Sequence, residues 1–417
     1  MRTVLIIYPH WPPSNLVGVH RIRLVANHLK EQGWHPIVLT VHESHYEHDP
    51  VPELNQLVDS SVEVIKTSAR PVRHLFGNRL IGDLGVRAFG ALRDAAQTLL
   101  STRTIDFIWF SVPSWYPPLM GPRLFRKFGV PYGIDYQDPW IHPLPEGTSR
   151  FSRARLTQRL AQLLEPQVLK DCQLITAINP AYIDGIAARH PELDGVPRCT
   201  FQLGFDEQDH TVDIGASPPW PSDAQTLLYA GAYLPLSEPF HRALFRALRK
   251  GVNKGTVPNK ICLVYIGTGR PDLPLTAIAQ EENVEPHVLE MPDRISFLSI
   301  QSLLKQTHGI LIVGSPEPHY SASKVFQCIL ANRPLLALLH DESEALDILR
   351  QCNAGHCSAG YTPGADGEFE ADVLAALETL FQDRMPWTVD TTPLAPYHAR
   401  RAAESLSMAM NRILDAR

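Results

Sequence analysis

The alternation of short apolar runs with amphipathic stretches is the feature that most constrains how this chain can fold. Runs rich in Val, Ile and Leu, such as Thr3 to Tyr8 and Ile37 to Thr40, are separated by segments whose apolar residues recur with helical spacing. Parallel strands that are covered by helices on both faces give this pattern. The sequence therefore predicts an α/β fold built on parallel sheets.

The expected strands form two series along the chain. Besides the two already named, they are Asp106–Ser111, Tyr132–Tyr136, Leu174–Ile178 and Thr200–Leu203 in the first series, and Thr226–Ala230, Lys260–Ile266, His287–Leu289, Gly309–Val313 and Leu335–Leu339 in the second. The stretch from Phe205 to Asp223 between the two series is polar and contains several prolines, which is typical of an exposed connection.

Chain length supports two domains. A single core stops growing at roughly 250 to 300 residues, and this chain has 417. We predict an N-terminal Rossmann-like domain over residues 1–205 and a second Rossmann-like domain over residues 224–396, both doubly wound and facing each other across a cleft. The amphipathic stretch 397–417 is expected to form a helix that returns to the first domain.

Composition narrows the function classes. A net charge of −6 and a pI near 6.3 give no general attraction for nucleic acid. The apolar run at the start is too short for a signal peptide, and no apolar window approaches the ~20 residues of a membrane span. The six cysteines include no Cys-x-x-Cys pair, which fits a reducing compartment. We expect a soluble, cytoplasmic protein.

The segment IDYQDPW, residues 134 to 140, follows an expected strand. Ligand sites in open α/β sheets lie beyond the carboxyl ends of the strands. Because Pro139 holds the preceding residue in an extended conformation and ends the strand, Asp138 is expected near the cleft. A carboxylate that caps the loop or pairs with an arginine is the alternative.

Two further loops are candidate anion sites. In HYSASKVFQ, a helix beginning near Ser321 to Lys324 would direct free backbone N–H groups, two serine hydroxyls and an ammonium at a diphosphate. In SNLVGVHR, Gly18 allows close approach of the backbone, and Arg21 could add a charge. An ordinary capped helix and a simple strand-to-helix loop with a solvated arginine are the respective alternatives.

Several long segments resemble a known family in the same order along the chain. They are PHWPPSNLVGVHRIRLVANHLKEQGWHPIVLT, DFIWFSVPSWYPPLMGPRLFRKFGVPYGIDYQDPW, LGFD and SASKVFQCILANRPLLAL. They resemble bacterial glycosyltransferases of the GT-B fold, and in particular the retaining family-four-like enzymes of surface polysaccharide biosynthesis. The resemblance implies metal-independent transfer of a sugar from a UDP- or GDP-type donor to a glycan, a lipid-linked or a small-molecule acceptor, with no other cofactor.

The chain departs from the family pattern at several functional positions. Gln137 stands where the family usually has a histidine, Ala232 and Glu238 fall near its basic residues, and His319 and Gln327 fall near its paired glutamates. Other residues must therefore bind the donor, or the chain does not bind it. A non-catalytic protein that binds sugar nucleotides and a sugar-nucleotide epimerase stay open as alternatives.

The resemblance and the loop chemistry together define the expected site. Asp138 is the expected catalytic group, as a base for the acceptor hydroxyl or as a stabiliser of positive charge. The expected donor-binding residues are Gly18, Arg21, Gly267, Gly269, Arg294, Ile295, Tyr320, Ser321, Ser323 and Lys324. The expected acceptor contacts are Trp140, Asp135 and Gln137, although Asp135 also suits a structural role and Trp140 a place in the core.

Two clusters of side chains could bind other partners, a metal ion in one case and a membrane surface in the other. The segment HESHYEH places His42, His45 and His48 in an irregular loop, which lacks the fixed geometry of a zinc site, so no metal is expected there. From Lys66 to Arg93, basic and apolar residues surround the single acid Asp83, a mixture that suits either peripheral membrane contact or a solvated pair of helices.

Overall fold

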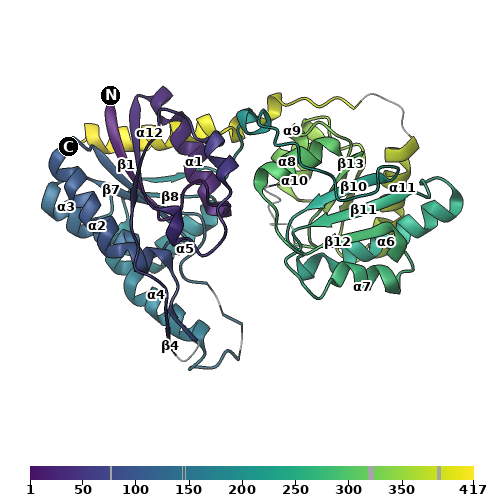
Figure 1. Cartoon of the computed structure of the whole chain (residues 1–417), viewed down its shortest axis with the longest axis horizontal. Coiled ribbons are helices and arrows are strands. Elements are labelled where there is room, and N and C mark those ends of the chain that lie inside the picture. The colour runs from purple at the N-terminus through teal and green to yellow at the C-terminus, as the bar shows by residue number, and fades with distance from the viewer. Residues whose placement is uncertain (76–77, 143, 146, 318–323, 383–386) are drawn as a thin grey trace. The chain divides into compact units, whose positions relative to one another are not determined.

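The computed structural model confirms the predicted α/β fold with two parallel-sheet, Rossmann-like domains. It describes residues 1–75, 78–142, 144–145, 147–317, 324–382 and 387–417. Unit 1 comprises Met1–Asp206 and Tyr397–Arg417, and unit 2 comprises Glu207–Pro396. Each unit has its own sheet and its own helices (Figure 1). Among the described residues, no helix is both long and apolar enough to cross a membrane.

The sheet of unit 1 is parallel throughout, with strand order β3-β2-β1-β6-β7-β8-β9. Its strands are β1 (Arg2–Ile7), β2 (Trp34–Val41), β3 (Glu63–Thr67), β6 (Phe107–Val112), β7 (Tyr132–Tyr136), β8 (Leu174–Ala177) and β9 (Arg198–Thr200). The chain builds outward from β1 in both directions, so the strand order reverses between β1 and β6. Ligands of open α/β sheets bind at such a reversal, outside the carboxyl ends of the strands.

Helices cover both faces of this sheet. They are α1 (Val17–Leu29), α2 (Leu84–Thr102), α3 (Gly121–Phe128), α4 (Arg153–Leu169), α5 (Pro180–Arg189) and α12 (Ala399–Asp415), and a small hairpin is formed by β4 (Arg73–Leu75) and β5 (Asn78–Ile81). Side chains alternate between the faces of a strand, and β1 shows this directly. Leu5 and Ile7 join the core under α2, whereas Val4 and Ile6 join the core under α1 and α12.

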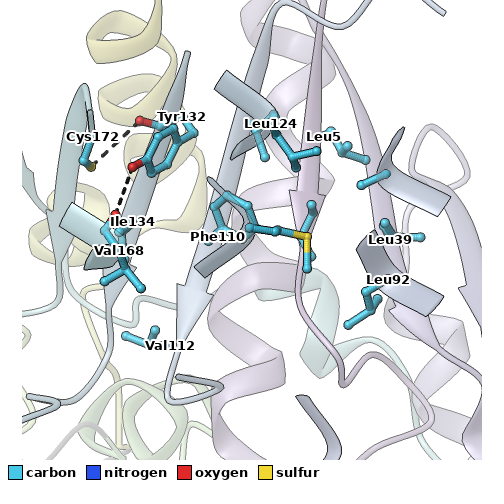
Figure 2. Packing of buried hydrophobic residues seen from close by; sticks show 14 of the residues in the cluster. Leu5, Leu39, Leu92, Phe110, Val112, Leu124, Tyr132, Ile134, Val168 and Cys172 are labelled. Atoms are coloured by element: carbon cyan, nitrogen blue, oxygen red, sulfur yellow. Dashed lines mark hydrogen bonds between the residues drawn. The ribbon is translucent and has the colours of Figure 1, made fainter. Parts of the chain in front are cut away.

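The core under α2 is closely packed. Phe110 lies among apolar side chains from the neighbouring strands and helices, including Leu5 and Leu124 (Figure 2). The hydroxyl of Tyr132 donates to the backbone carbonyl of Val168 at 2.9 Å, which joins β7 to the end of α4. The buried polar end of this tyrosine is therefore satisfied without water.

The sheet of unit 2 has the parallel order β12-β11-β10-β13-β14-β15. Its strands are β10 (Gln225–Ala230), β11 (Ile261–Ile266), β12 (Val288–Met291), β13 (Gly309–Val313), β14 (Leu335–His340) and β15 (Ser358–Tyr361). Its helices are α6 (Glu238–Lys254), α7 (Pro274–Glu281), α8 (Phe297–Gln306), α9 (Val325–Leu330), α10 (Glu344–Gln351) and α11 (Asp366–Gln382). The strand order reverses between β10 and β13.

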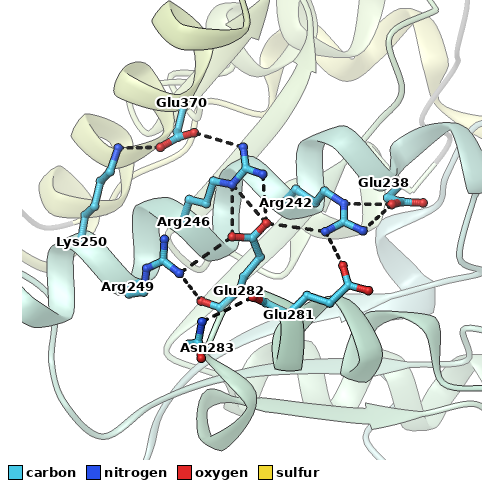
Figure 3. A network of polar contacts seen from close by, with 9 residues as sticks. All are labelled: Glu238, Arg242, Arg246, Arg249, Lys250, Glu281, Glu282, Asn283 and Glu370. Carbon is cyan, nitrogen blue, oxygen red and sulfur yellow. Dashed lines mark hydrogen bonds and ion pairs between the residues drawn. The ribbon is translucent and has the colours of Figure 1, made fainter.

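A charged network joins two of these helices. Glu282, just after α7, is 9% exposed and accepts charge-assisted hydrogen bonds from Arg246 of α6, with Arg242 and Arg249 nearby (Figure 3). A carboxylate that is shared by several arginines is better ordered than an isolated surface pair. The network therefore fixes α7 against α6 and has a structural role.

Candidate functional site

In unit 1, the strand reversal is surrounded by residues that follow β1, β6 and β7. Gln137 donates from its side-chain amide to the carbonyl of Gly18 at 3.0 Å and to the hydroxyl of Ser111 at 2.9 Å. A Cβ atom on Gly18 would lie 2.7 Å from the hydroxyl oxygen of Tyr8 and 3.2 Å from Oε1 of Gln137. Gly18 is thus required by close packing, and Gln137, expected at the acceptor, is buried beneath the start of α1.

Arg21 and Asp135 form a buried ion pair. Nε and Nη2 of Arg21 donate to the two carboxylate oxygens at 2.9 and 2.8 Å, and the side chains are 1% and 0% exposed. Ser111 and Thr176 donate further hydrogen bonds to the same carboxylate. The structure thus gives both residues a role in joining α1 to the sheet, which differs from the ligand contacts that the sequence predicts for them.

Asp138 differs from Asp135 because its side chain is exposed. The surrounding protein raises the pKa of its carboxyl above the usual range, and His142 opposes this shift. Burial raises the pKa values of the Tyr8 and Tyr182 hydroxyls, and the charge of Asp138 adds to both shifts. A partly desolvated carboxylate therefore lies at the carboxyl edge of the sheet, close to two tyrosines.

Trp140 follows Asp138 and is almost fully buried in the core under α2. Its ring is stacked on that of Trp115, with the centroids 5.4 Å apart and the planes at 13°. Trp115 keeps more exposure than Trp140 and was not predicted as a site residue. Its signal in the sequence is SWYPP, an aromatic pair directly after the apolar run of β6.

The histidine-rich loop forms a shallow pocket beside the end of β1. The pocket is lined by His42, Glu43, Ser44, Tyr46, Glu47, His48, Asp49 and Pro50. The rings of Tyr46 and His48 are stacked with centroids 5.4 Å apart, and His10 lies 5.3 Å from Tyr46. Burial and the neighbouring His48 lower the pKa of His10 to about 4, so this ring is neutral near pH 7. His10, which lies in the loop after β1, was not predicted as a site residue.

In unit 2, Lys324 and Gly231 lie together at the strand reversal. The ammonium of Lys324, which follows β13, lies 3.8 Å from the centre of the Tyr229 ring. A Cβ atom on Gly231, directly after β10, would lie 2.7 Å from Nζ of Lys324, and Gly231 has a φ of 151°. The ammonium therefore lies at the carboxyl end of β10. The basic residues of the resembled family would fall just beyond this end, near the positions that Ala232 and Glu238 occupy in this chain.

The loops after β11 and β12 lie side by side. The N–H groups of Gly267 and Gly269 donate to the carbonyls of Met291 and Pro292 at 2.8 and 2.9 Å. A Cβ atom on Gly267 would lie 3.7 Å from Cγ of Arg294. The structure thus brings together both glycines, the exposed Arg294 and the neighbouring Ile295, all predicted at the donor nucleotide.

The remaining predicted donor residues, Tyr320, Ser321 and Ser323, lie outside the described residues. Helix α9 has six residues and begins just after Lys324, without a side-chain cap. Gln327 of this helix has hydrogen-bond partners within unit 2. Its Oε1 accepts hydrogen bonds from Gln301 and from Nε2 of His210, each at 2.6 Å. The ammonium of Lys324, and not the end of a helix, is therefore the described group that can bind an anion here.

The two Rossmann-like sheets define the class of fold as GT-B, and solved structures match the chain over its full length. One is sucrose-phosphate synthase from Thermosynechococcus elongatus, with 12% identity, 100% of both chains covered and a TM-score of 0.58. Another is HepE from Anabaena in complex with UDP and glucose, with 16% identity, 100% and 98% of the two chains covered and a TM-score of 0.52.

A glycosyltransferase from Rickettsia africae matches with 14% identity, 100% of this chain and 96% of that chain covered and a TM-score of 0.53. No family model matches the chain, and no curated protein sequence matches it either. At such low identities the structural likeness establishes the fold but not the function.

Proposed function

We propose that the protein is a glycosyltransferase that uses a nucleotide-sugar donor bound by unit 2. The observation that carries the proposal is the position of the Lys324 ammonium beside Gly231, at the strand reversal where α/β sheets bind nucleotides. A lysine there can meet the charge of a diphosphate, and the glycine lets the ligand approach the backbone. The complex of HepE with UDP and glucose supports a UDP-type donor.

The nucleotide end of the donor is assigned to the paired loops after β11 and β12. Gly267, Gly269, Arg294 and Ile295 would border the base and ribose, since they continue the same carboxyl edge outward from Gly231. We also propose that Tyr320, Ser321 and Ser323 bind the donor, as the sequence predicts. In agreement with the family resemblance, we propose a reaction that needs no metal.

Asp138 is the proposed base. As the bond from the sugar to the diphosphate breaks, the acceptor hydroxyl attacks the anomeric carbon and its proton passes to the carboxylate. The nucleoside diphosphate leaves with its negative charge near Lys324, where a fixed cation stabilises it. A carboxyl with a raised pKa is a better base for this step, because its proton affinity lies closer to neutral pH.

One observation favours a second candidate, a protein that binds sugar nucleotides without transferring the sugar. Gln137, at the position of the family histidine, is buried, and its amide is engaged by Gly18 and Ser111. That position therefore supplies no acid or base. Turnover separates the two candidates, because only a transferase consumes the donor when an acceptor is present.

A thermal-shift screen against UDP, GDP, dTDP and CMP sugars tests the donor site, since a ligand that binds only the folded state raises the melting temperature. We expect one nucleotide class to raise it and Lys324→Ala to abolish the shift. Lys260→Ala is the matched control, because Lys260 is an exposed lysine of unit 2 paired with Asp223. No shift with any nucleotide, or an unchanged shift in Lys324→Ala, would contradict the proposed donor site.

A further inference from the structure

Helix α4 exposes an apolar stripe that none of the described side chains of unit 1 covers. Leu156, Leu160 and Leu163 are 53%, 43% and 68% exposed, and Phe151 just before the helix is 87% exposed. The spacing of the three leucines places them on one face of the helix. Among the described residues, four of the nine exposed large apolar side chains are found in this short segment. Such clustering marks an interaction surface.

The orientation of α4 is fixed by its opposite face. Ala161, Val168 and Leu169 are buried in the core of unit 1. Glu165 is fully buried, accepts two hydrogen bonds at 3.0 Å from Arg189 of α5 and lies 3.0 Å from Nε2 of His190. The stripe therefore faces outward because the helix is anchored on its other side.

The charged residues within the segment that carries the stripe are all basic. Residues 147–164 contain Arg150, Arg153, Arg155 and Arg159 and no acidic residue, although the whole chain carries a net charge of −6. Of these arginines, Arg150, Arg153 and Arg159 are exposed. A helix with apolar side chains on one face and basic side chains beside them has the composition of an interfacial helix, which lies in the plane of a membrane surface.

We propose that α4, together with Phe151, docks unit 1 on an anionic lipid surface. The leucines and the phenylalanine would enter the boundary between head groups and acyl chains, and the arginines would bind lipid phosphates. A second copy of the chain fits less well, because a two-fold contact through this face would bring the two sets of arginines together. The proposal is independent of the donor site, and it favours a lipid-linked acceptor for the proposed transferase.

This segment differs from the stretch Lys66 to Arg93 that the sequence offers for membrane contact, of which the side chains of residues 73–81 lie outside the described part of the chain. In the stretch from Lys66 to Arg93, Leu84 and Ala88 of α2 are buried in the core. Arg87 is also buried, with its guanidinium donating to the carbonyls of Arg70 and His45 and pairing with Glu47. The buried side chains of α2 therefore hold the fold together, whereas the three leucines of α4 are exposed. Figure 1 shows α4 at the lower end of unit 1 in this view.

Co-sedimentation of the full chain with vesicles tests the proposal. The probes are phosphatidylcholine vesicles with and without phosphatidylglycerol, at low and high salt. We expect binding to the anionic vesicles only, weakened by salt. The double variant Leu160→Gln/Leu163→Gln should bind at least about tenfold more weakly, because the apolar area that enters the interface is reduced. Arg153→Gln/Arg159→Gln should bind more weakly and respond less to salt.

Controls separate docking from folding and from the donor site. Met408→Gln changes an exposed apolar residue on α12, another helix that carries arginines, and should bind vesicles as the wild type does. All three variants should keep the melting temperature and the nucleotide shift of the wild type, because the changed side chains are outside the core. Absence of vesicle binding by the wild type, or equal binding by the leucine variant, would overturn the proposal. So would a dimer that the leucine variant dissociates, since the face would then bind a second copy.

Discussion

Asp135 and Asp138 are three residues apart, and their surroundings give them different chemistry. Asp135 belongs to a central strand and is paired with a buried guanidinium, so it is inaccessible. Asp138 follows the strand end that Pro139 imposes, and its carboxyl is exposed with a raised pKa. The sequence predicts the strand end and the position of Asp138. It does not reveal that Arg21, 114 residues earlier, is the partner of Asp135, because an arginine in the first turns of a helix usually faces solvent.

Removing this arginine should destabilise unit 1 strongly. Arg21→Met leaves the carboxylate of Asp135 buried without its counter-charge, which costs about 3 to 5 kcal/mol. Urea denaturation measures the loss of unfolding free energy. Arg2→Met is the control, because Arg2 and Asp415 form an exposed pair worth under about 1 kcal/mol. Equal effects of the two changes would show that the buried pair adds little.

Gly231→Ala should weaken donor binding by displacing the ammonium of Lys324. The new methyl group would lie 2.7 Å from Nζ, so the flexible lysine side chain must move away, and the φ of 151° adds backbone strain. We expect the Kd for the nucleotide to rise about tenfold, the loss of roughly one charge-assisted contact, as measured by calorimetric titration. Gly255→Ala is the control, because Gly255 has a positive φ and nothing within 4 Å of the added Cβ. An unchanged Kd in Gly231→Ala would contradict the proposed phosphate site.

Asp138 should control turnover and its pH dependence. Asp138→Asn is expected to lower kcat about 10²- to 10⁴-fold while nucleotide binding persists. Because the base must be ionised and its pKa is raised, the wild-type rate should fall on acidification at a pH above the ordinary aspartate pKa of 3.8. His142→Ala removes the group that opposes the shift, so the acidic limb should move to higher pH. Steady-state kinetics across pH checks both effects, and an Asn variant with wild-type kcat would exclude Asp138 as the base.

Among the elements, α12 is joined to α1 by packing and by a cluster of polar side chains. Ala402, Leu406 and Met410 share a core with residues of α1. His28 of α1, Asp206 and His398 each offer one metal-ligand atom within 4.8 Å of the others. Nδ1 of His398 already accepts the N–H of Arg400 at 3.0 Å as the cap of α12. The proton of the neutral ring is therefore on Nε2, and a hydrogen-bonded cluster fits the residues better than a metal site does.

The pair of His28 and Asp206 should make the stability of unit 1 depend on pH. Burial lowers the pKa of His28, but the hydrogen bond and charge of Asp206 outweigh it, so the net shift is upward. Because the pKa of His28 is higher in the folded state, protonation of His28 stabilises the fold. This stabilisation is complete below the unfolded-state pKa of 6.5 and is lost as the pH rises through the folded-state pKa. His28→Asn should therefore lower Tm more at pH 6 than at pH 9, with a loss of about 1 to 3 kcal/mol at the lower pH.

Thermal unfolding of the wild type and this variant across pH provides the measurement, and a chelator provides the control. A hydrogen-bonded cluster keeps its Tm when EDTA is added. A Tm that falls with EDTA in the wild type, but not in His28→Asn, would show that the three residues hold a metal. A pH-independent difference between the two proteins would contradict the protonation argument.

The sequence predicts central strands better than edge strands. The buried strands β1, β6 and β13 are continuous apolar runs, because both faces of a central parallel strand are covered. The strand β3, with the sequence EVIKT, and the strand β15, with the sequence SAGY, lie at the sheet edges, are partly exposed and have no such run. Neither was predicted. The strand β9, also at a sheet edge and partly exposed, begins two residues before its predicted start for the same reason.

At the scale of the whole molecule, the sequence reveals single proposed site residues better than the contacts between them. Asp138 could be predicted because it follows an apolar run at a strand end, and Lys324 because it lies where a helix is expected to begin. The contact between Lys324 and Gly231 could not, because it joins the end of β10 to the residue before α9 across 93 residues of sequence. Sheet order decides which strand ends are neighbours, and no local pattern encodes that order.

Because donor binding is assigned to residues of unit 2 alone, the fragment 207–396 should fold and bind the nucleotide without unit 1. It contains a complete six-stranded sheet, its own core and both Gly231 and Lys324. We expect a single cooperative thermal transition whose Tm rises with the nucleotide that stabilises the full chain. Lys324→Ala in the same fragment should abolish the rise.

The complementary truncation, which keeps residues 1–396, should lower the stability of unit 1 instead. It lacks α12, whose apolar face shares a core with α1, so unit 1 would expose Ile22 and Val25 to water. We expect the unfolding transition of unit 1 to move to lower temperature while the nucleotide-dependent transition of unit 2 stays in place. If the fragment 207–396 folds but binds no nucleotide, unit 1 must supply donor contacts, and the assignment of Gly18 to the donor regains support. If removing α12 shifts the nucleotide-dependent transition instead, the two units do not unfold separately.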